Sequence, residues 1–192
     1  ALRLEDDDGD EVSQRLQSTG QTVAYGAYDA WDGTNTALDD IDMVLVLEEY
    51  NYASDIAEDG ACGIVIGYVK SGGTFVFTEW TAYDMGYENV KLRLEPLVPF
   101  NVESYVDFDY GGTFATSVAS ALTAGVPASF DVINELTDGG VCIALKSVAR
   151  MLITRDFDLY PPEVTECDQG GGHPGLVVHR VGLGTVVWFN SD

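Results

Sequence analysis

Carboxylates gather where two of the predicted strands end. An acidic turn after the first predicted strand contains Asp6, Asp7 and Asp8, and Glu48 follows the apolar run 42–47. Parallel strands of an open α/β sheet bring their carboxyl ends to one edge, so we expect these side chains to share a crevice. Ca²⁺ and Mg²⁺ take oxygen ligands. The pattern predicts a Ca²⁺ or Mg²⁺ site; the alternative is a solvated acidic turn that caps the following helix.

Glu79 follows the next apolar run, 74–78, and should reach the same edge. Paired carboxylates can act as acid and base in glycoside hydrolysis. A hydrolase that uses Glu79 with Asp7 or Asp8 is therefore one functional alternative. Repulsion between several carboxylates in one crevice needs relief, from a bound cation or from raised pKa values. The other interpretation is that these carboxylates belong to a generally acidic surface.

Aromatic residues lie in the loops expected at that edge: Tyr25, Tyr28, Trp31, Tyr50, Tyr52, Trp80 and Tyr83. Exposed aromatic rings beside acidic groups suit a face that binds a sugar or a protein. We therefore expect Trp31, Glu79 and Trp80 to contact a glycan or protein partner. The alternative is that the rings cover the core beneath long loops.

The elements that would position these residues alternate as in βαβ units, which predicts a parallel sheet flanked by helices. The unbroken apolar run 42–47 suits a strand buried on both faces. Two glycines after 56–69 are a helix stop signal, and Gly60 and Gly63 suggest that this helix begins only at Ala61. The predicted strands are 1–5, 22–25, 42–47, 74–78, 141–145 and 150–154, with a hairpin formed by 175–180 and 185–189.

The charge balance restricts the partners. The chain has 192 residues, 46% of them hydrophobic, which suits a single domain over 1–192. With 32 acidic and 9 basic residues the net charge is -23, which argues against nucleic acid and anionic lipid, because phosphate binding needs Lys and Arg. No apolar run is long enough for membrane insertion. Such a surface suits an extracellular or cell-surface setting, or the cytoplasm of a salt-adapted organism.

Several short motifs carry a family resemblance. The runs DMVLVL, YVKSGGTFVFTEW, LTAGVP and PGLVVHRVGLGTVVWFNSD resemble the class I glutamine amidotransferase-like fold. The resemblance implies an α/β, flavodoxin-like three-layer sandwich, with a mostly parallel sheet and a C-terminal antiparallel hairpin. Many members are non-catalytic modules of larger extracellular or cell-surface proteins, so the resemblance implies a binding or structural module, with self-assembly left open.

The catalytic members of that family place a cysteine at a tight strand-to-helix elbow, with His and Glu supplied late in the chain. Here the elbow falls at Glu79-Trp80-Thr81, and no His-x-Glu pair follows. Cys62 stands between glycines but precedes a helix, which leaves a degenerate cysteine amidotransferase as a further alternative. The other cysteines, Cys142 and Cys167, fit no zinc pattern, and the three thiols allow at most one disulfide of undecided pairing.

Overall fold

The computed structural model describes most of the chain. The predicted metal ligands Asp6, Asp7, Asp8 and Glu48 lie outside the described residues, as does Cys167. The described residues are 1–4, 11–26, 31–34, 36–47, 56, 60–88, 92–104, 106–108, 112–132, 140–157 and 173–191. No helix among them is long and apolar enough to cross a membrane.

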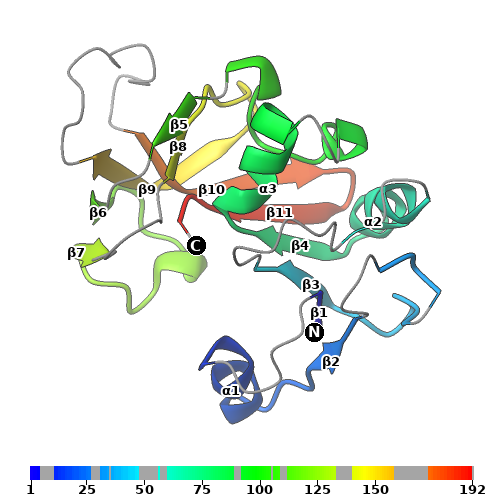
Figure 1. Ribbon diagram of the computed structural model, residues 1–192. Helices are drawn as coiled ribbons and strands as arrows, with labels where there is room; N and C mark the ends of the chain where they lie inside the picture. The colour runs from blue at the N-terminus through cyan, green and yellow to red at the C-terminus, as the bar shows by residue number, and fades with distance from the viewer. Residues whose placement is uncertain are drawn as a thin grey trace.

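One half of the sheet is parallel. Its strands stand in the order β2-β1-β3-β4-β11, and every neighbouring pair runs parallel. From β1 the chain adds β2 on one side, and it then adds β3 and β4 on the other side. Because of this change of direction, α1 and α2 lie on opposite faces of the sheet (Figure 1). Their bounds are β1 Leu2–Arg3, α1 Glu11–Ser18, β2 Ala24–Tyr25, β3 Met43–Val46, α2 Ala61–Lys70, β4 Thr74–Phe77 and β11 Gly184–Phe189. The α/β flavodoxin-like arrangement is thereby confirmed.

The other half is antiparallel, in the order β11-β10-β9-β6-β7. The predicted hairpin is present as β10, His173–Val181, and β11, joined through Gly182 and Leu183. The antiparallel part extends beyond this hairpin through β6 Gly112–Thr116, β7 Ser129–Val132 and β9 Arg150–Phe157. The sheet is therefore mixed, and the short strands β6 and β7 gave no clear signal in the sequence.

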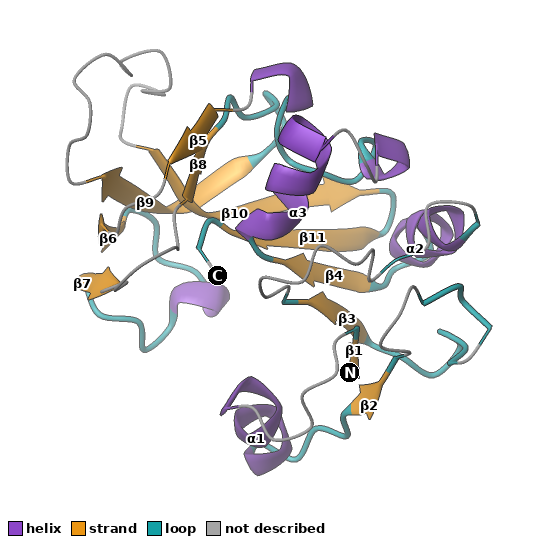
Figure 2. Ribbon diagram, in the orientation of Figure 1, coloured by secondary structure: helices purple, strands orange, loops and turns teal. Residues whose placement is uncertain are grey.

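The segment between β4 and β6 forms short helices and a small ribbon on the face that carries α2 (Figure 2). The elements there are α3 Glu79–Tyr83, a π-helix Asp84–Glu88, 3-10 turns Leu92–Leu94 and Val102–Ser104, and β5 Val106–Phe108. The ribbon is completed by β8 Gly140–Cys142, which follows β7 in the chain and pairs antiparallel with β5. A further 3-10 turn, Ala121–Thr123, lies between β6 and β7.

The main core lies between the sheet and the α2–α3 layer. Phe77, Phe100 and Trp188 are fully buried there, with ring centroids 6.2 Å apart for Phe77–Phe100 and 4.8 Å for Phe100–Trp188. A smaller core on the opposite face stacks Phe114 on Phe130 and on Phe189, at 5.2 and 5.4 Å. Alternate residues of β11 thus serve the two cores, since Val186 and Trp188 belong to the main core and Phe189 packs against the smaller one, as the period-2 geometry of a strand requires.

Candidate functional site

The carboxyl edge of the parallel strands is where ligands bind in folds of this kind. Here β4 ends at Phe77, and Thr78 connects it to α3 with extended backbone angles of φ −99° and ψ −171°. The Thr78 N–H donates to the Val46 carbonyl at 3.2 Å, which continues the pairing of β4 with β3. Thr78 is therefore unstrained, and the strand passes directly into the helix.

Two buried carboxylates bound the short helix α3. Glu79 opens the helix and is 4% exposed, while Asp84 follows its last residue and is 9% exposed. Both interact with neighbouring groups of the protein, as buried acids must to avoid a large desolvation cost. Glu79 thus lies inside the protein at the predicted elbow, and its carboxylate is not presented to solvent.

Three hydroxyl groups are buried close to this edge in the fold. They belong to Thr78, Thr81 and Ser191, and none has a hydrogen-bond partner among the described residues. The pairing of Trp188 with Phe77 brings the end of β11, and so Ser191, to the same edge as Thr78. An unsatisfied buried hydroxyl costs about 1–3 kcal/mol. The described part of this edge is therefore polar, and these three hydroxyls are not exposed to solvent.

The predicted aromatic residues occupy different environments. Trp31 is fully buried in the main core, where its indole N–H donates to the Thr36 carbonyl at 3.3 Å. Trp80 is half-buried on α3, and its ring meets that of Tyr83 edge to face at 5.4 Å. The structure therefore brings Glu79 and Trp80 together on α3, whereas Trp31 serves packing rather than an exposed face.

Cys62 and His179 are also internal. Cys62 is fully buried on the inner face of α2. His179, on β10, is 6% exposed, and burial lowers the pKa of its imidazole below the usual value. The positive charge of Lys146 lowers this pKa further, while a hydrogen bond with the Val148 backbone opposes the shift. Since the shift is downward, His179 is neutral at physiological pH.

One internal residue of the antiparallel half had no counterpart in the sequence-based predictions. The Arg155 guanidinium is fully buried, lies 5.2 Å from the centre of the Phe114 ring, and donates from Nη1 to the Asn190 carbonyl. Asn190 in turn donates through Nδ2 to the Pro174 carbonyl at 2.7 Å. These bonds hold the segment that follows β11. No signal in the sequence indicated this burial, because β9 also contains the polar residues Arg150, Thr154 and Asp156.

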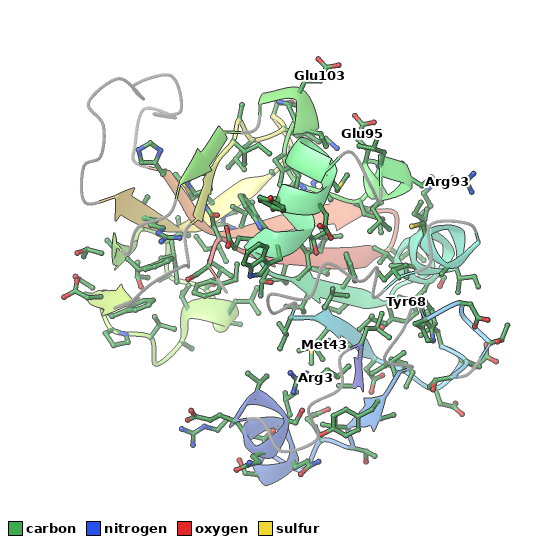
Figure 3. The ribbon with its side chains drawn as sticks, viewed as in Figure 1. Arg3, Met43, Tyr68, Arg93, Glu95 and Glu103 are labelled. Carbon is green, nitrogen blue, oxygen red and sulfur yellow. The ribbon has the colours of Figure 1, made fainter. Side chains whose placement is uncertain are left out.

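A concavity lies at the opposite, amino edge of the parallel strands. It has a volume of about 700 Å³ and lies between Gly33 with the segment 37–42 on one side and the C-terminal end of α2 on the other. Tyr68 lines it, and Figure 3 shows this residue beneath α2, close to the light-blue segment that precedes β3. The Tyr68 hydroxyl accepts a hydrogen bond from the Thr74 N–H at 3.2 Å. Burial raises the pKa of Tyr68, the hydrogen bond with the Thr74 backbone opposes this shift, and the charge of Asp42 adds to it.

Solved structures of other proteins share this fold. A ThuA-like protein from Bacteroides uniformis is 11% identical, with a TM-score of 0.64, and the match covers 98% of this chain and 80% of that one. A cytoplasmic protein from Salmonella typhimurium is 16% identical over 93% of this chain and 74% of that one, with a TM-score of 0.62. No family model and no curated protein sequence matches the chain.

A β-galactosidase from Rahnella sp. R3 is 19% identical, with a TM-score of 0.61; the match covers 94% of this chain but 23% of that enzyme. This chain thus spans about a quarter of the length of the β-galactosidase that it matches. At these identities the likeness concerns the fold alone. Together, the structures support an α/β flavodoxin-like fold for this chain.

Proposed function

We propose that this chain is a non-catalytic domain of amidotransferase-like fold that serves binding or structure within a larger protein or assembly. The observation that carries the proposal is the junction after β4. Where catalytic members of the family hold a reachable nucleophile, this chain has Glu79, which is 4% exposed and is preceded by Thr78 in ordinary extended conformation. A nucleophile must be accessible to substrate and within reach of a base.

The burial of Cys62 supports the same proposal. A reactive thiol needs partial exposure and an electropositive environment that favours the thiolate. Cys62 instead faces the main core together with Ala61, Val65 and Val69 on the inner side of α2. Substrate could reach it only if α2 left the sheet. A cysteine amidotransferase that works through Cys62 is therefore a weaker alternative.

The likeness to part of a β-galactosidase offers further support. In that protein, a segment with this fold makes up only a fraction of the polypeptide. A domain of this architecture can therefore stand as one part of a longer chain, which is the setting that the proposal gives it.

A second candidate is a hydrolase that uses Glu79 with Asp7 or Asp8. One observation favours it: Thr78 and Thr81 place buried hydroxyls without described partners on either side of Glu79. Such groups are found where a ligand or water completes the hydrogen bonding. The two candidates differ in whether Glu79 performs chemistry or packs within the protein.

A turnover assay with matched variants tests both. The purified chain, Glu79→Gln and Cys62→Ser would be incubated with glutamine, p-nitrophenyl esters and p-nitrophenyl glycosides, with circular dichroism to confirm folding. Glu103→Gln is the control, since Glu103 is exposed (Figure 3). We expect every sample to match the buffer rate. Turnover lost only in Glu79→Gln would establish the hydrolase, and turnover lost only in Cys62→Ser would establish the amidotransferase.

A further inference from the structure

The cavity at the amino edge has the size of a small-molecule site. Its volume, about 700 Å³, lies within the range of roughly 300–1,000 Å³ that is typical of ligand pockets. Its walls come from Gly33 with the segment 37–42 and from the C-terminal end of α2 with the turn that follows it. At Gly67 and Gly72 a side chain would meet no atom within 4 Å, so the cavity reaches the backbone itself. Both glycines keep it open.

The lining carries negative charge only. Asp39 and Asp42 contribute carboxylates, and no Lys, Arg or His lines the cavity. Neither side chain has a hydrogen bond or an ion pair to any part of the chain that the structure describes. The C-terminal end of α2, a helix of ten residues, adds the negative end of its dipole. Lys70, in the last turn of α2, is not among the lining residues.

The remaining lining is aromatic and aliphatic. Tyr68 is held firmly, because its hydroxyl bonds to Thr74 and its ring packs directly against the Gly73 backbone. Leu38, Ile41 and Ile64 supply apolar surface. An aromatic ring beside carboxylates is the combination that recognises an organic ammonium group, through charge and through the face of the ring. Aliphatic walls would receive the stem that bears the cation.

A divalent metal fits this lining less well than an organic cation does. Ca²⁺ takes about six to eight oxygen ligands. The cavity offers two carboxylates, and no cluster of three or more His, Cys, Asp or Glu residues suited to a metal occurs among the described residues. The Ser71 hydroxyl, which also lies there, is already engaged with the Tyr68 carbonyl at 2.8 Å. An ammonium group needs only a few acceptors.

We propose that this amino-edge cavity binds a small organic cation, with an ammonium or guanidinium group between Asp39 and Asp42 and an apolar stem against Leu38, Ile41 and Tyr68. The site lies at the edge of the sheet opposite Glu79. It therefore stands or falls independently of the function proposed for the carboxyl edge.

Isothermal titration calorimetry with hexylammonium chloride tests the proposal, with 1-hexanol as the neutral analogue and CaCl₂ at equal ionic strength. Asp39→Asn and Asp42→Asn remove the lining carboxylates. Asp40→Asn is the matched control, because it makes the same change of charge in the same segment but does not line the cavity. This control matters because a chain of net charge -23 attracts cations non-specifically.

A second pair of variants tests the volume of the cavity. Gly67→Leu would fill it, whereas Gly63→Leu places the same side chain on the same helix, also in open space, but outside the lining. Both remove a glycine from a helix and should raise the melting temperature by about 2–4 °C each. Folding is thus checked within the pair, and only Gly67→Leu should lose binding.

We expect saturable 1:1 binding of hexylammonium, weakened about threefold by Asp39→Asn and by Asp42→Asn and abolished by Gly67→Leu. Asp40→Asn and Gly63→Leu should bind as the natural chain does, and 1-hexanol should bind more weakly. Absence of hexylammonium binding would overturn the proposal. It would also be overturned if Asp40→Asn weakened binding as much as Asp39→Asn and Asp42→Asn do, because the cation would then be attracted by the overall charge and not by the cavity. If Ca²⁺ bound with the same affinity and the same dependence on Asp39 and Asp42, the result would contradict the proposal and indicate a metal site instead. If either leucine variant fails to fold, the three asparagine variants still decide.

Discussion

The two edges of the parallel half are filled in opposite ways. At the carboxyl edge, Thr78, Glu79 and Thr81 are polar residues that the fold buries. At the amino edge, glycines at the end of α2 leave a hollow of about 700 Å³, with Asp39 and Asp42 at its wall. The difference teaches that the edge where open α/β sheets bind ligands is, in its described part, occupied by the protein's own side chains. The open concavity lies where the topology does not require one.

The largest expected effect concerns the packing that supports the amino edge. Gly184 begins β11, and an added side chain there would collide with the Val69 and Gly73 carbonyls. Because backbone atoms cannot easily move aside, we expect Gly184→Val to lose about 3 kcal/mol of stability or to fail to fold. Gly67→Ala, in open space on α2, should instead gain about 1 kcal/mol. Urea unfolding measures both changes in stability. If Gly184→Val unfolded at the same urea concentration as the natural chain, the close approach of Gly184 to the Val69 and Gly73 carbonyls would be contradicted.

The wall of the hollow gives the next effect. Tyr68→Phe keeps the ring that packs on Gly73 but removes the acceptor of the Thr74 N–H. We expect a loss of about 1 kcal/mol in urea unfolding, the usual contribution of one hydrogen bond. A variant as stable as the natural chain would show that water replaces the hydroxyl, and that Tyr68 is not fixed by this bond.

The carboxyl edge should respond in the opposite direction. Thr78→Val replaces a buried hydroxyl that has no described partner with a methyl group of similar shape. We expect a gain of up to about 1 kcal/mol, since desolvation of the hydroxyl is avoided. Thr113→Val is the control and should lose stability, because the Thr113 hydroxyl donates to Asp131 at 2.7 Å. A loss in Thr78→Val would reveal a bound water or ligand, and would favour the hydrolase candidate.

The smallest effect is a pH dependence carried by His179. Its pKa is lowered by burial and by Lys146, so the unfolded chain takes up the proton first as the pH falls. The contribution of His179 to stability is therefore complete above pH of about 6.5 and declines below it, toward the folded-state pKa. The stability of the natural chain relative to His179→Gln should fall between pH 8 and pH 5.5. His173→Gln, at the other end of β10, is the control. If the difference in stability between the natural chain and His179→Gln stayed the same across this pH range, the lowering of the His179 pKa by burial would be contradicted.

Local signals were enough for the elements of the parallel half. The apolar runs at 42–47 and 74–78 contain β3 and β4, and the glycine stop after residue 70 ends α2, which begins at Ala61 as the glycines before it indicate. The C-terminal hairpin could also be predicted from the sequence, because two apolar runs flank a short glycine-containing turn. In these segments neighbours in the sequence supply most of the structural preference.

Other features depended on residues far apart in the chain. The strands β6 and β7 are short, and they gain their place by pairing with each other and with β9. Nothing local to Trp31 distinguishes an exposed ring from one in the core, and nothing local to Arg155 indicates the Phe114 ring and the Asn190 carbonyl that surround it. Burial is a property of the assembled layers.

The sequence by itself determined the fold class, the acidic surface and the lack of a cysteine at the elbow after β4, because each follows from residue types and their order along the chain. Only the tertiary structure decided that Glu79 is buried and that a hollow opens at the amino edge. The physical reason is the same in both cases. Exposure and cavity volume depend on how closely α2, α3 and the segment 37–42 pack against the sheet, and no local sequence pattern encodes that packing.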